Sequence, residues 1–530
     1  MVVKEPDGAA VPGAVMLFAL AALMVFGALF LGASRRPLPM MIAELAALAL
    51  LVGVLLPWRA PMHLAAPGFG AGRPLSRPLQ SFLILLSLVP LIQLLPVTAG
   101  LWAELPGRAF YAESIRLANG SSGLDWRAIS LIPSATEAAW LALLPPLAVF
   151  VVAMRLDRER LLILVLIFLG IATLQALLGL AQYGSAAQTD SALGTYLNRN
   201  HLAGLLEMAL PVSLALLAAT VGHTRPPHAA GRHGRRKRTF RQWVARFSVT
   251  RINQAAALGA VSLAILLGLI FTRSRAGVTL AMVGILLSTL MFSYRLGGRN
   301  TYGLIGTFTA VGVGTASLIG LVPVWSRFTY SDPFEDGRWK IFDATVRAIG
   351  EFFPLGSGAG TFVEVLRRFH PASFPGVTIN RAHNDYLEWL LEFGLIAGVL
   401  ILVWLLFYVR QWGRVWKRGD WTIWRFAQAG SGIALLLMML HTLVDYNLRT
   451  PANAVATAFV AAVFFHRTRS DDERRYRRQT GSGASAAAPQ PDYRIPPENS
   501  EQSVRGLRHA GNLRRSLWVD LALPNRGATT

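Results

Sequence analysis

The chain has 530 residues, of which 53% are hydrophobic and only 15% are charged. Soluble domains carry about a quarter charged residues, so this composition excludes an ordinary soluble protein. It contains no cysteine, which excludes disulfides, thiolate metal sites and cysteine nucleophiles. We interpret the net charge of +22 as the basic loops of a membrane protein and not as a nucleic-acid-binding surface.

Long apolar runs recur along most of the chain, each with about 18 or more residues and almost no charge, enough to cross a hydrocarbon core of about 30 Å. The first, residues 11–31, has no convincing small-residue cleavage site after it, so we interpret it as a membrane helix and not as a cleaved signal. The pattern predicts an all-α polytopic membrane helix bundle with about twelve spans, near residues 12–33, 38–56, 79–97, 135–154, 160–181, 202–221, 255–271, 276–294, 302–322, 386–409, 426–444 and 450–466.

The distribution of basic residues predicts how the bundle is oriented. The segment 222–254 contains nine Arg or Lys and no Asp or Glu, and a short loop this basic belongs in the cytoplasm. Both termini then lie in the cytoplasm, and the long loop 323–385 lies on the opposite side. Residues 1–466 form the predicted transmembrane catalytic domain. The basic cytoplasmic tail 467–530 is predicted to be disordered, because it has too few apolar residues to build a core.

Arginines gather on the predicted outer side, against the positive-inside trend. They are Arg199 in "NRNHLAG", Arg273 and Arg275 in "FTRSRAG", and Arg338 in "DGRWK". A guanidinium fork suits phosphate oxygens, although each arginine has the simpler alternative of pairing with a carboxylate or snorkelling to headgroups. Because Arg273 and Arg275 have no acidic neighbour in the sequence, we favour an anion site at the membrane surface, such as a lipid-linked phosphate or pyrophosphate.

A histidine opens the tenth predicted span, in "RAHNDYLEWLLEFGLIAG". At a helix N-terminus the helix dipole disfavours a protonated imidazole, so His383 is a candidate general base. The alternative is that His383 only caps the helix. A second candidate pair, His441 and Asp445 in "HTLVDYNLR", is spaced i, i+4 with Arg449 at i+8, as on one helical face.

Several of these stretches together resemble the bacterial O-antigen ligase and O-antigen polymerase superfamily. "HN" at 383–384, nine residues and then Gly394 resemble its His-Asn motif. "NRNHLAG", "SRAG", "PLGSGAGTF" and "LVDYNLRTPANA" resemble further elements of the family in the same order, over about residues 80–466.

The resemblance implies an all-helical glycosyltransferase of the C-type that inverts the anomeric centre without a metal or other cofactor. Its donor would be an undecaprenyl-pyrophosphate-linked glycan, and its acceptor a glycan or lipid-A core. The enzyme would be a multi-pass protein of the bacterial inner membrane, in contact with membrane lipid, with a periplasmic active site. Matched by position, Arg275 and Arg199 would bind pyrophosphate and His383 would be catalytic. We further assign substrate binding to Arg273, Arg338, Asn384, Asp445 and His441.

Two alternatives remain open from the sequence. A protein O-oligosaccharyltransferase of the same superfamily would carry the same motifs but a different acceptor. A small-anion transporter would also have many spans and basic inner loops. We see no second copy of the first six spans and no paired Gly/Pro-broken helices at midplane depth, and the marked residues lie at one membrane face, which together favour an enzyme.

Overall fold

The computed structural model describes residues 37–55, 75–119, 126–184, 191–222, 249–296, 337–417 and 421–467. Several expected features lie outside these described residues. They are the spans 12–33 and 302–322, most of the basic loop 222–254, residues 323–336 of the expected outer loop, and the tail beyond residue 467.

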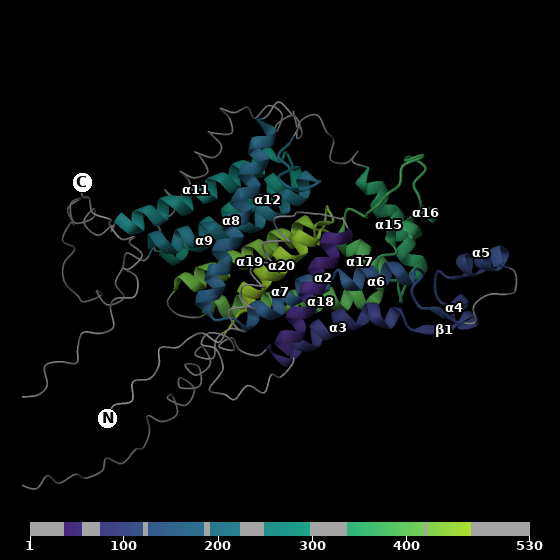
Figure 1. Ribbon diagram of the computed structural model, residues 1–530. Helices are drawn as coiled ribbons and strands as arrows, with labels where there is room; N and C mark the ends of the chain where they lie inside the picture. Colours follow the sequence, from purple (N-terminus) through teal and green to yellow (C-terminus); the bar gives the residue numbers. More distant parts are fainter. Residues whose placement is uncertain are drawn as a thin grey trace, which may run out of the picture. The chain divides into compact units, whose positions relative to one another are not determined.

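Helices make up nearly all of the described elements (Figure 1). In chain order they are α2 (Pro37–Leu55), α3 (Arg77–Gln93), α4 (Ala99–Glu104), α5 (Ala109–Asn119), α6 (Pro133–Leu141), α7 (Leu144–Arg155), α8 (Arg158–Tyr183), α9 (Arg199–Gly222), α11 (Val249–Phe271), α12 (Arg275–Leu296), α15 (Arg338–Phe352), α16 (Phe362–Arg368), α17 (Asp385–Phe393), α18 (Leu395–Lys417), α19 (Ile423–His441), the 3-10 helix η2 (Asn447–Arg449) and α20 (Pro451–Phe465). Two short strands, β1 (Pro96–Thr98) and β2 (Trp126–Ala128), pair antiparallel with Val97 opposite Arg127.

Within the described residues, seven helical segments are long and apolar enough to cross a membrane. They are Pro133–Arg155, Arg158–Tyr183, Arg199–Val221, Asn253–Phe271, Arg275–Tyr294, Leu395–Trp416 and Ile423–His441. Three shorter apolar helices are Leu38–Val54, Arg77–Gln93 and Pro451–Phe465. The predicted all-helical membrane fold is therefore confirmed, whereas the count of about twelve spans and the large outer loop stay predictions.

Helix α9 is enclosed by other helices, because it packs against α8, α11, α12, α19 and α20. Every residue from 201 to 219 is buried, as expected for a helix that is apolar on all sides. Glycines allow the close crossings: a Cβ on Gly268 would lie 2.5 Å from the Cβ of Ala176, and a Cβ on Gly430 would lie 2.7 Å from that of Ala215. This packing fixes α9, and with it the residues at its start.

The expected single span 386–409 is divided into two helices, so that prediction was wrong in its boundaries. Helix α17 ends at Phe393, Gly394 adopts a φ of 59°, and α18 begins at Leu395. A Cβ on Gly394 would lie 2.0 Å from the carbonyl oxygen of Pro354. A glycine is needed here both for the left-handed φ and for the close approach of the 354–358 backbone.

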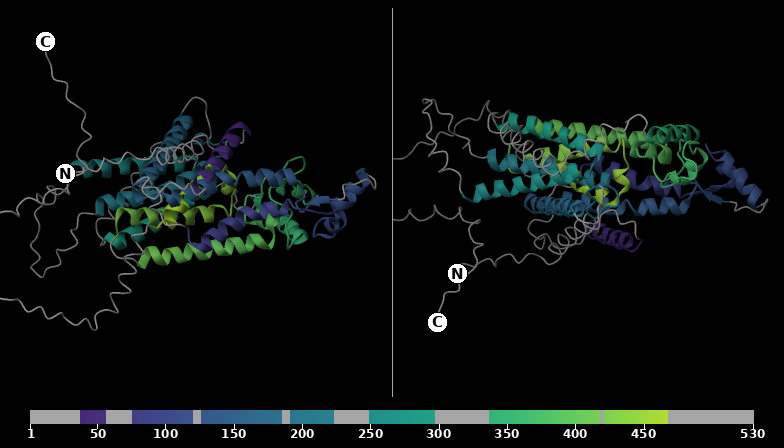
Figure 2. Two further views of the ribbon diagram at one scale, coloured as in Figure 1. Left: turned by 60° about the horizontal axis from the view of Figure 1, so that its bottom comes forward. Right: turned by 90° about the horizontal axis from the view of Figure 1, so that it is seen from above.

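One end of the described helices carries the shorter helices α4, α5, α15 and α16 together with the strand pair of β1 and β2 (Figures 1 and 2). The buried side chain of Arg108 joins two of these segments, because its Nη2 donates to the carbonyls of Ile129 (2.8 Å) and Gly356 (3.2 Å). The loop 354–358 in turn bonds to the end of α17, through the N–H of Ser357 to Leu391 O (2.9 Å). These contacts support the segment that carries His383.

Candidate functional site

Three helices begin with an arginine for which the sequence predicts phosphate binding: α9 at Arg199, α12 at Arg275 and α15 at Arg338. The starts of α9 and α12 lie side by side, since a Cβ on Gly277 would lie 2.6 Å from the Cβ of Ala203. The first N–H groups of a helix lack intrahelical partners and form the positive end of the helix dipole. Adjacent helix N-termini that also carry arginines favour the binding of an anion.

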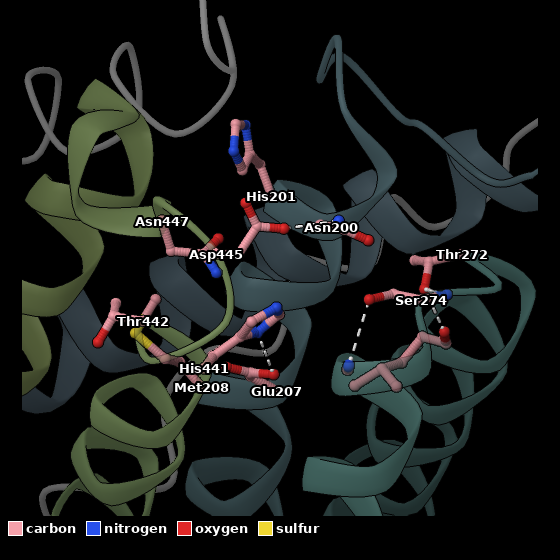
Figure 3. Close-up of polar contacts among 12 residues, drawn as sticks. Asn200, His201, Glu207, Met208, Thr272, Ser274, His441, Thr442, Asp445 and Asn447 are labelled. Atoms are coloured by element: carbon pink, nitrogen blue, oxygen red, sulfur yellow. Dashed lines mark hydrogen bonds and ion pairs between the residues drawn. The ribbon is translucent and has the colours of Figure 1, made fainter. Parts of the chain in front are cut away.

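Asp445, in the connection between α19 and α20, joins two of these helix starts, those of α9 and α15. Its Oδ2 accepts a hydrogen bond from Asn200 Nδ2 at 2.6 Å, in the first turn of α9 (Figure 3). The same oxygen lies 3.7 Å from Nη2 of Arg338, and Arg338 also donates to the carbonyl of Val444 at 2.6 Å. Oδ1 of Asp445 lies 3.4 Å from Nδ1 of His383. One buried carboxylate thus brings together α9, α15 and the predicted base.

The surroundings of Asp445 keep it ionised. Burial alone would raise the pKa of this carboxyl, but the neighbouring His383 imidazole and the charge of Arg338 outweigh burial and hold its pKa well below the usual range. The N–H of Tyr446 also donates to Oδ1, at 2.9 Å. Asp445 therefore carries a negative charge at neutral pH and is placed to orient the imidazole of His383.

His383 is partly exposed and has a strained backbone. Its side chain is 29% exposed, and its φ of 53° lies in the left-handed region, which is unusual for a residue with a side chain. The helix cap is Asn384, whose Oδ1 accepts the N–H of Leu387 at 3.0 Å and whose Nδ2 donates to Leu443 O at 2.9 Å. Capping is thus the role of Asn384 and not of His383, while substrate binding by Asn384 stays a prediction.

Tyr446 lies between two histidine rings. Its ring centroid is 4.9 Å from that of His383 and 4.8 Å from that of His201, with edge-to-face geometry in both pairs. His201 is buried, and its Nδ1 is hydrogen-bonded to the hydroxyl of Thr450 at 3.0 Å. Edge-to-face packing limits the orientations open to an aromatic ring. Tyr446 therefore restricts the ring of His383 from the side.

The sequence offered Asp445 as a candidate partner of His441, but the ring of His441 is hydrogen-bonded to a different carboxylate. Helix α19 ends at His441, so residues 441, 445 and 449 do not share one helical face. Nδ1 of His441 lies 2.9 Å from Oε2 of Glu207 on α9, and both side chains are fully buried (Figure 3). His441 and Glu207 therefore form a buried, hydrogen-bonded pair that links α19 to α9.

The turn before α12 holds Arg273, the fourth predicted arginine, and leads into Arg275. Arg273 has a φ of 55°, and Ser274 caps the helix because its Oγ accepts the N–H of Gly277 at 3.2 Å. The N–H of Ser274 in turn donates to the hydroxyl of Thr272 at 3.2 Å (Figure 3). This network orients the chain so that Arg275 is the first residue of α12.

Two further buried ionisable residues, Asp385 and Arg449, lie close in sequence to the residues of the site. Asp385, the first residue of α17, accepts the N–H of Leu448 at 2.9 Å, and burial raises the pKa of this carboxyl to about 8. Arg449 follows in η2; burial would lower its pKa, but Glu392 and Glu388 outweigh burial and raise it. The guanidinium of Arg449 thus stays charged among acidic neighbours.

The structure brings together His383, Asp445 and Arg338 by direct contact, and places Arg199 and Arg275 at neighbouring helix starts. Sequence reasoning missed Asn200, Tyr446 and Glu207 as partners of the site. Asn200 lies inside a stretch already marked, but nothing in the sequence links it to Asp445. In the part of the chain that the structure describes, no three His, Asp or Glu form a group that could hold a metal ion.

The segment 260–402 runs from α11 to the beginning of α18 and includes the turn before α12, α15 and His383. Residues 260–402 match the family model of the O-antigen ligases. The match confirms the resemblance to the O-antigen ligase and polymerase superfamily and indicates an O-antigen-ligase-like role in glycan assembly at a membrane. A comparison with curated proteins gave no match. Asp445 and the start of α9 lie outside the matched O-antigen ligase segment, and the fold brings both of them to it.

Proposed function

We propose that this protein is a metal-independent, inverting glycosyltransferase that transfers a saccharide from undecaprenyl pyrophosphate to a glycan or lipid-A-core acceptor. The observation that carries the proposal is the buried Asp445 carboxylate. It contacts both the imidazole of His383 and the guanidinium of Arg338, beside the start of α9. These contacts support the proposal because they link His383, the proposed base, to an arginine and to the N-terminus of α9.

His383 and Asp445 serve the acceptor. A carboxylate at Nδ1 favours the tautomer with its proton on Nδ1, which leaves the lone pair of Nε2 to accept a proton. The acceptor hydroxyl oxygen attacks the anomeric carbon as its proton passes to His383. The bond between the anomeric carbon and the phosphate oxygen breaks, and its electron pair leaves with the pyrophosphate. Attack opposite the leaving group inverts the anomeric centre.

Arg275 and Arg199 serve the donor. Negative charge grows on the pyrophosphate as the glycosidic bond breaks, and fixed positive groups stabilise that charge more strongly than they stabilise the ground state. The starts of α9 and α12 supply both guanidinium groups and backbone N–H groups at neighbouring positions. Arg338 and Arg273 extend the same cationic face.

The proposed orientation places this face in the periplasm of a bacterium and both termini in the cytoplasm. It rests on the basic segment 222–254, because reversing the chain would place nine positive charges outside. Reporter fusions at Arg236 and Gly376 test it. Phosphatase activity is expected only at position 376, and the opposite pattern would contradict the orientation.

The proposed activity is tested with purified protein, a defined undecaprenyl-pyrophosphate-linked oligosaccharide and three acceptors: a glycan, a lipid-A core and a serine-containing peptide. We expect transfer to the glycan or to the lipid-A core, unchanged by a chelator, with one undecaprenyl pyrophosphate released for each bond formed. Transfer only to the peptide would assign a protein O-oligosaccharyltransferase. If no acceptor is modified but proteoliposomes accumulate phosphate, the protein is a small-anion transporter and not a glycosyltransferase.

A further inference from the structure

Glu388 is a fully buried carboxylate on α17 that the proposed chemistry does not use. Its Oε2 accepts the backbone N–H of Ala382 at 3.1 Å, directly before His383. Its Oε1 accepts a hydrogen bond from Nη1 of Arg381 at 2.8 Å and lies 3.3 Å from Nε of Arg449. One side chain therefore holds two consecutive residues of the segment that enters the site.

The residues after His383 are held from the other side. The N–H of Asp385 donates to Thr442 O at 3.0 Å, and Asn384 donates to Leu443 O at 2.9 Å. His383 thus lies between two anchored segments while its own φ is 53°. A left-handed φ at a non-glycine residue persists only where its surroundings hold it in place. Glu388 supplies the anchor on the N-terminal side of this conformation.

We propose that Glu388 is a positioning residue, which fixes the backbone on the N-terminal side of His383 so that the imidazole stays against Asp445. The inference rests on the proposed role of His383 as general base. A carboxylate is required because its two oxygens accept hydrogen bonds from Arg381 and Ala382 while its charge pairs with Arg449. An amide has one acceptor oxygen, and its NH2 would face either the N–H of Ala382 or the guanidinium groups of Arg381 and Arg449.

Glu392 is a matched control on the same helix. It is also fully buried and also bonds to Arg449, whose Nη2 donates to its Oε2. Among the described residues, the side chain of Glu392 forms its hydrogen bond and ion pair with Arg449, and none joins it to residues 381–383. Loss of either carboxylate disturbs the buried charges around Arg449, whereas only loss of Glu388 releases the backbone before His383.

The experiment compares Glu388→Gln, Glu388→Asp, Glu392→Gln and His383→Ala in the transfer assay, with thermal unfolding in detergent as the measure of folding. We expect Glu388→Gln to lower kcat by about 10²-fold with donor KM within a few-fold of wild type, since misplacing a catalytic group by about 1 Å has effects of this size. Glu388→Asp keeps the charge but is one methylene shorter, so it should fold and still lower kcat. Glu392→Gln should lower the unfolding temperature but keep kcat.

The decisive measurement adds Glu388→Asp to His383→Ala. If Glu388 acts through His383, the double variant loses no further activity beyond His383→Ala alone. Wild-type kcat in the folded Glu388→Asp variant overturns the inference. So does an equal kcat loss in Glu392→Gln, or a fully additive loss in the double variant. Wild-type turnover in His383→Ala would instead overturn the proposed function itself, so the two failures are distinguished.

Discussion

His383 and Asp445 come from separate segments, yet Nδ1 of the histidine lies 3.4 Å from Oδ1 of the aspartate. His383 directly precedes the cap of α17, and Asp445 lies in the turn between α19 and η2. The backbone contact from Asp385 N–H to Thr442 O, at 3.0 Å, joins the same two segments. The pair is therefore built by the packing of α17 against the end of α19, and it gives the imidazole a fixed, ionised partner.

Replacing His383 tests the general base. His383→Ala should reduce transfer by about 10²–10⁴-fold while donor binding is kept, because the arginines bind the pyrophosphate. His383→Asn should not restore transfer, because an amide cannot accept a proton at neutral pH and because the helix is already capped by Asn384. Turnover and donor binding are measured on the same preparations. His370→Ala, in the segment before α17, is the matched histidine control and should keep full turnover; high activity in His383→Asn would rule out base catalysis.

Replacing Asp445 tests the partner of the base. Asp445→Asn should lower kcat by about 10²–10⁴-fold, because the imidazole loses the charge that sets its tautomer. The pKa of Asp445 is held below its usual range, so this carboxylate is ionised across an ordinary assay range and the substitution removes a charge throughout that range. kcat and donor KM are measured on folded protein. Wild-type kcat in folded Asp445→Asn would show that His383 does not depend on this carboxylate.

Replacing Arg275 with lysine tests bidentate binding of the pyrophosphate. The charge is kept but the planar fork is lost, so kcat/KM for the donor should fall by about 10²-fold while the protein still inserts. Arg347→Lys is the matched control, because Arg347 is exposed and pairs with Asp343 in the same helix. Arg199→Lys should follow Arg275→Lys. Wild-type kcat/KM in Arg275→Lys would assign that arginine a structural role only.

The buried pair of His441 and Glu207 should affect stability more than chemistry. His441→Leu leaves Glu207 buried without its partner, a change that typically destabilises a protein by about 3–5 kcal/mol. The double variant Glu207→Leu with His441→Leu should recover part of that loss, since both polar groups are removed together. The free energies of unfolding of the wild type, both single variants and the double variant are compared by thermal unfolding. If folded His441→Leu is inactive while His383→Ala is active, the base has been assigned to the wrong histidine.

The raised pKa of Asp385 predicts how the stability of the folded protein depends on pH. Burial raises its pKa to about 8 from an ordinary value near 4, so the folded protein binds a proton in this window that the unfolded chain releases. Stability therefore falls as pH rises from about 4 to 8, because the folded state holds more protons than the unfolded state. Asp385→Asn resembles the protonated form and should flatten this dependence, raising the unfolding temperature more at pH 8 than at pH 5. A uniform decrease at both values would show an ionised Asp385 paired with Arg449.

The membrane class, the helical fold and the main polar stretches followed from the sequence alone. Apolar runs of membrane-spanning length have few other stable arrangements, because unpaired backbone groups are costly in hydrocarbon. The arginines at 199, 275 and 338 were recognisable because they lie on the predicted outer side, against the positive-inside trend, and the stretch around His383 was recognisable from its family resemblance.

The partners within the site were decided by tertiary structure. Periodicity placed His441 and Asp445 on one helical face, but α19 ends at His441, and Glu207 from α9 takes the position expected for Asp445. Periodicity also treated residues 386–409 as one span, whereas the close approach of Pro354 to Gly394 divides it. Hydrophobic patterning specifies which faces are buried, not which distant residues meet there. The contacts of Asp445 with Asn200, Arg338 and His383 depend on how separate helices pack, and only the fold determines that.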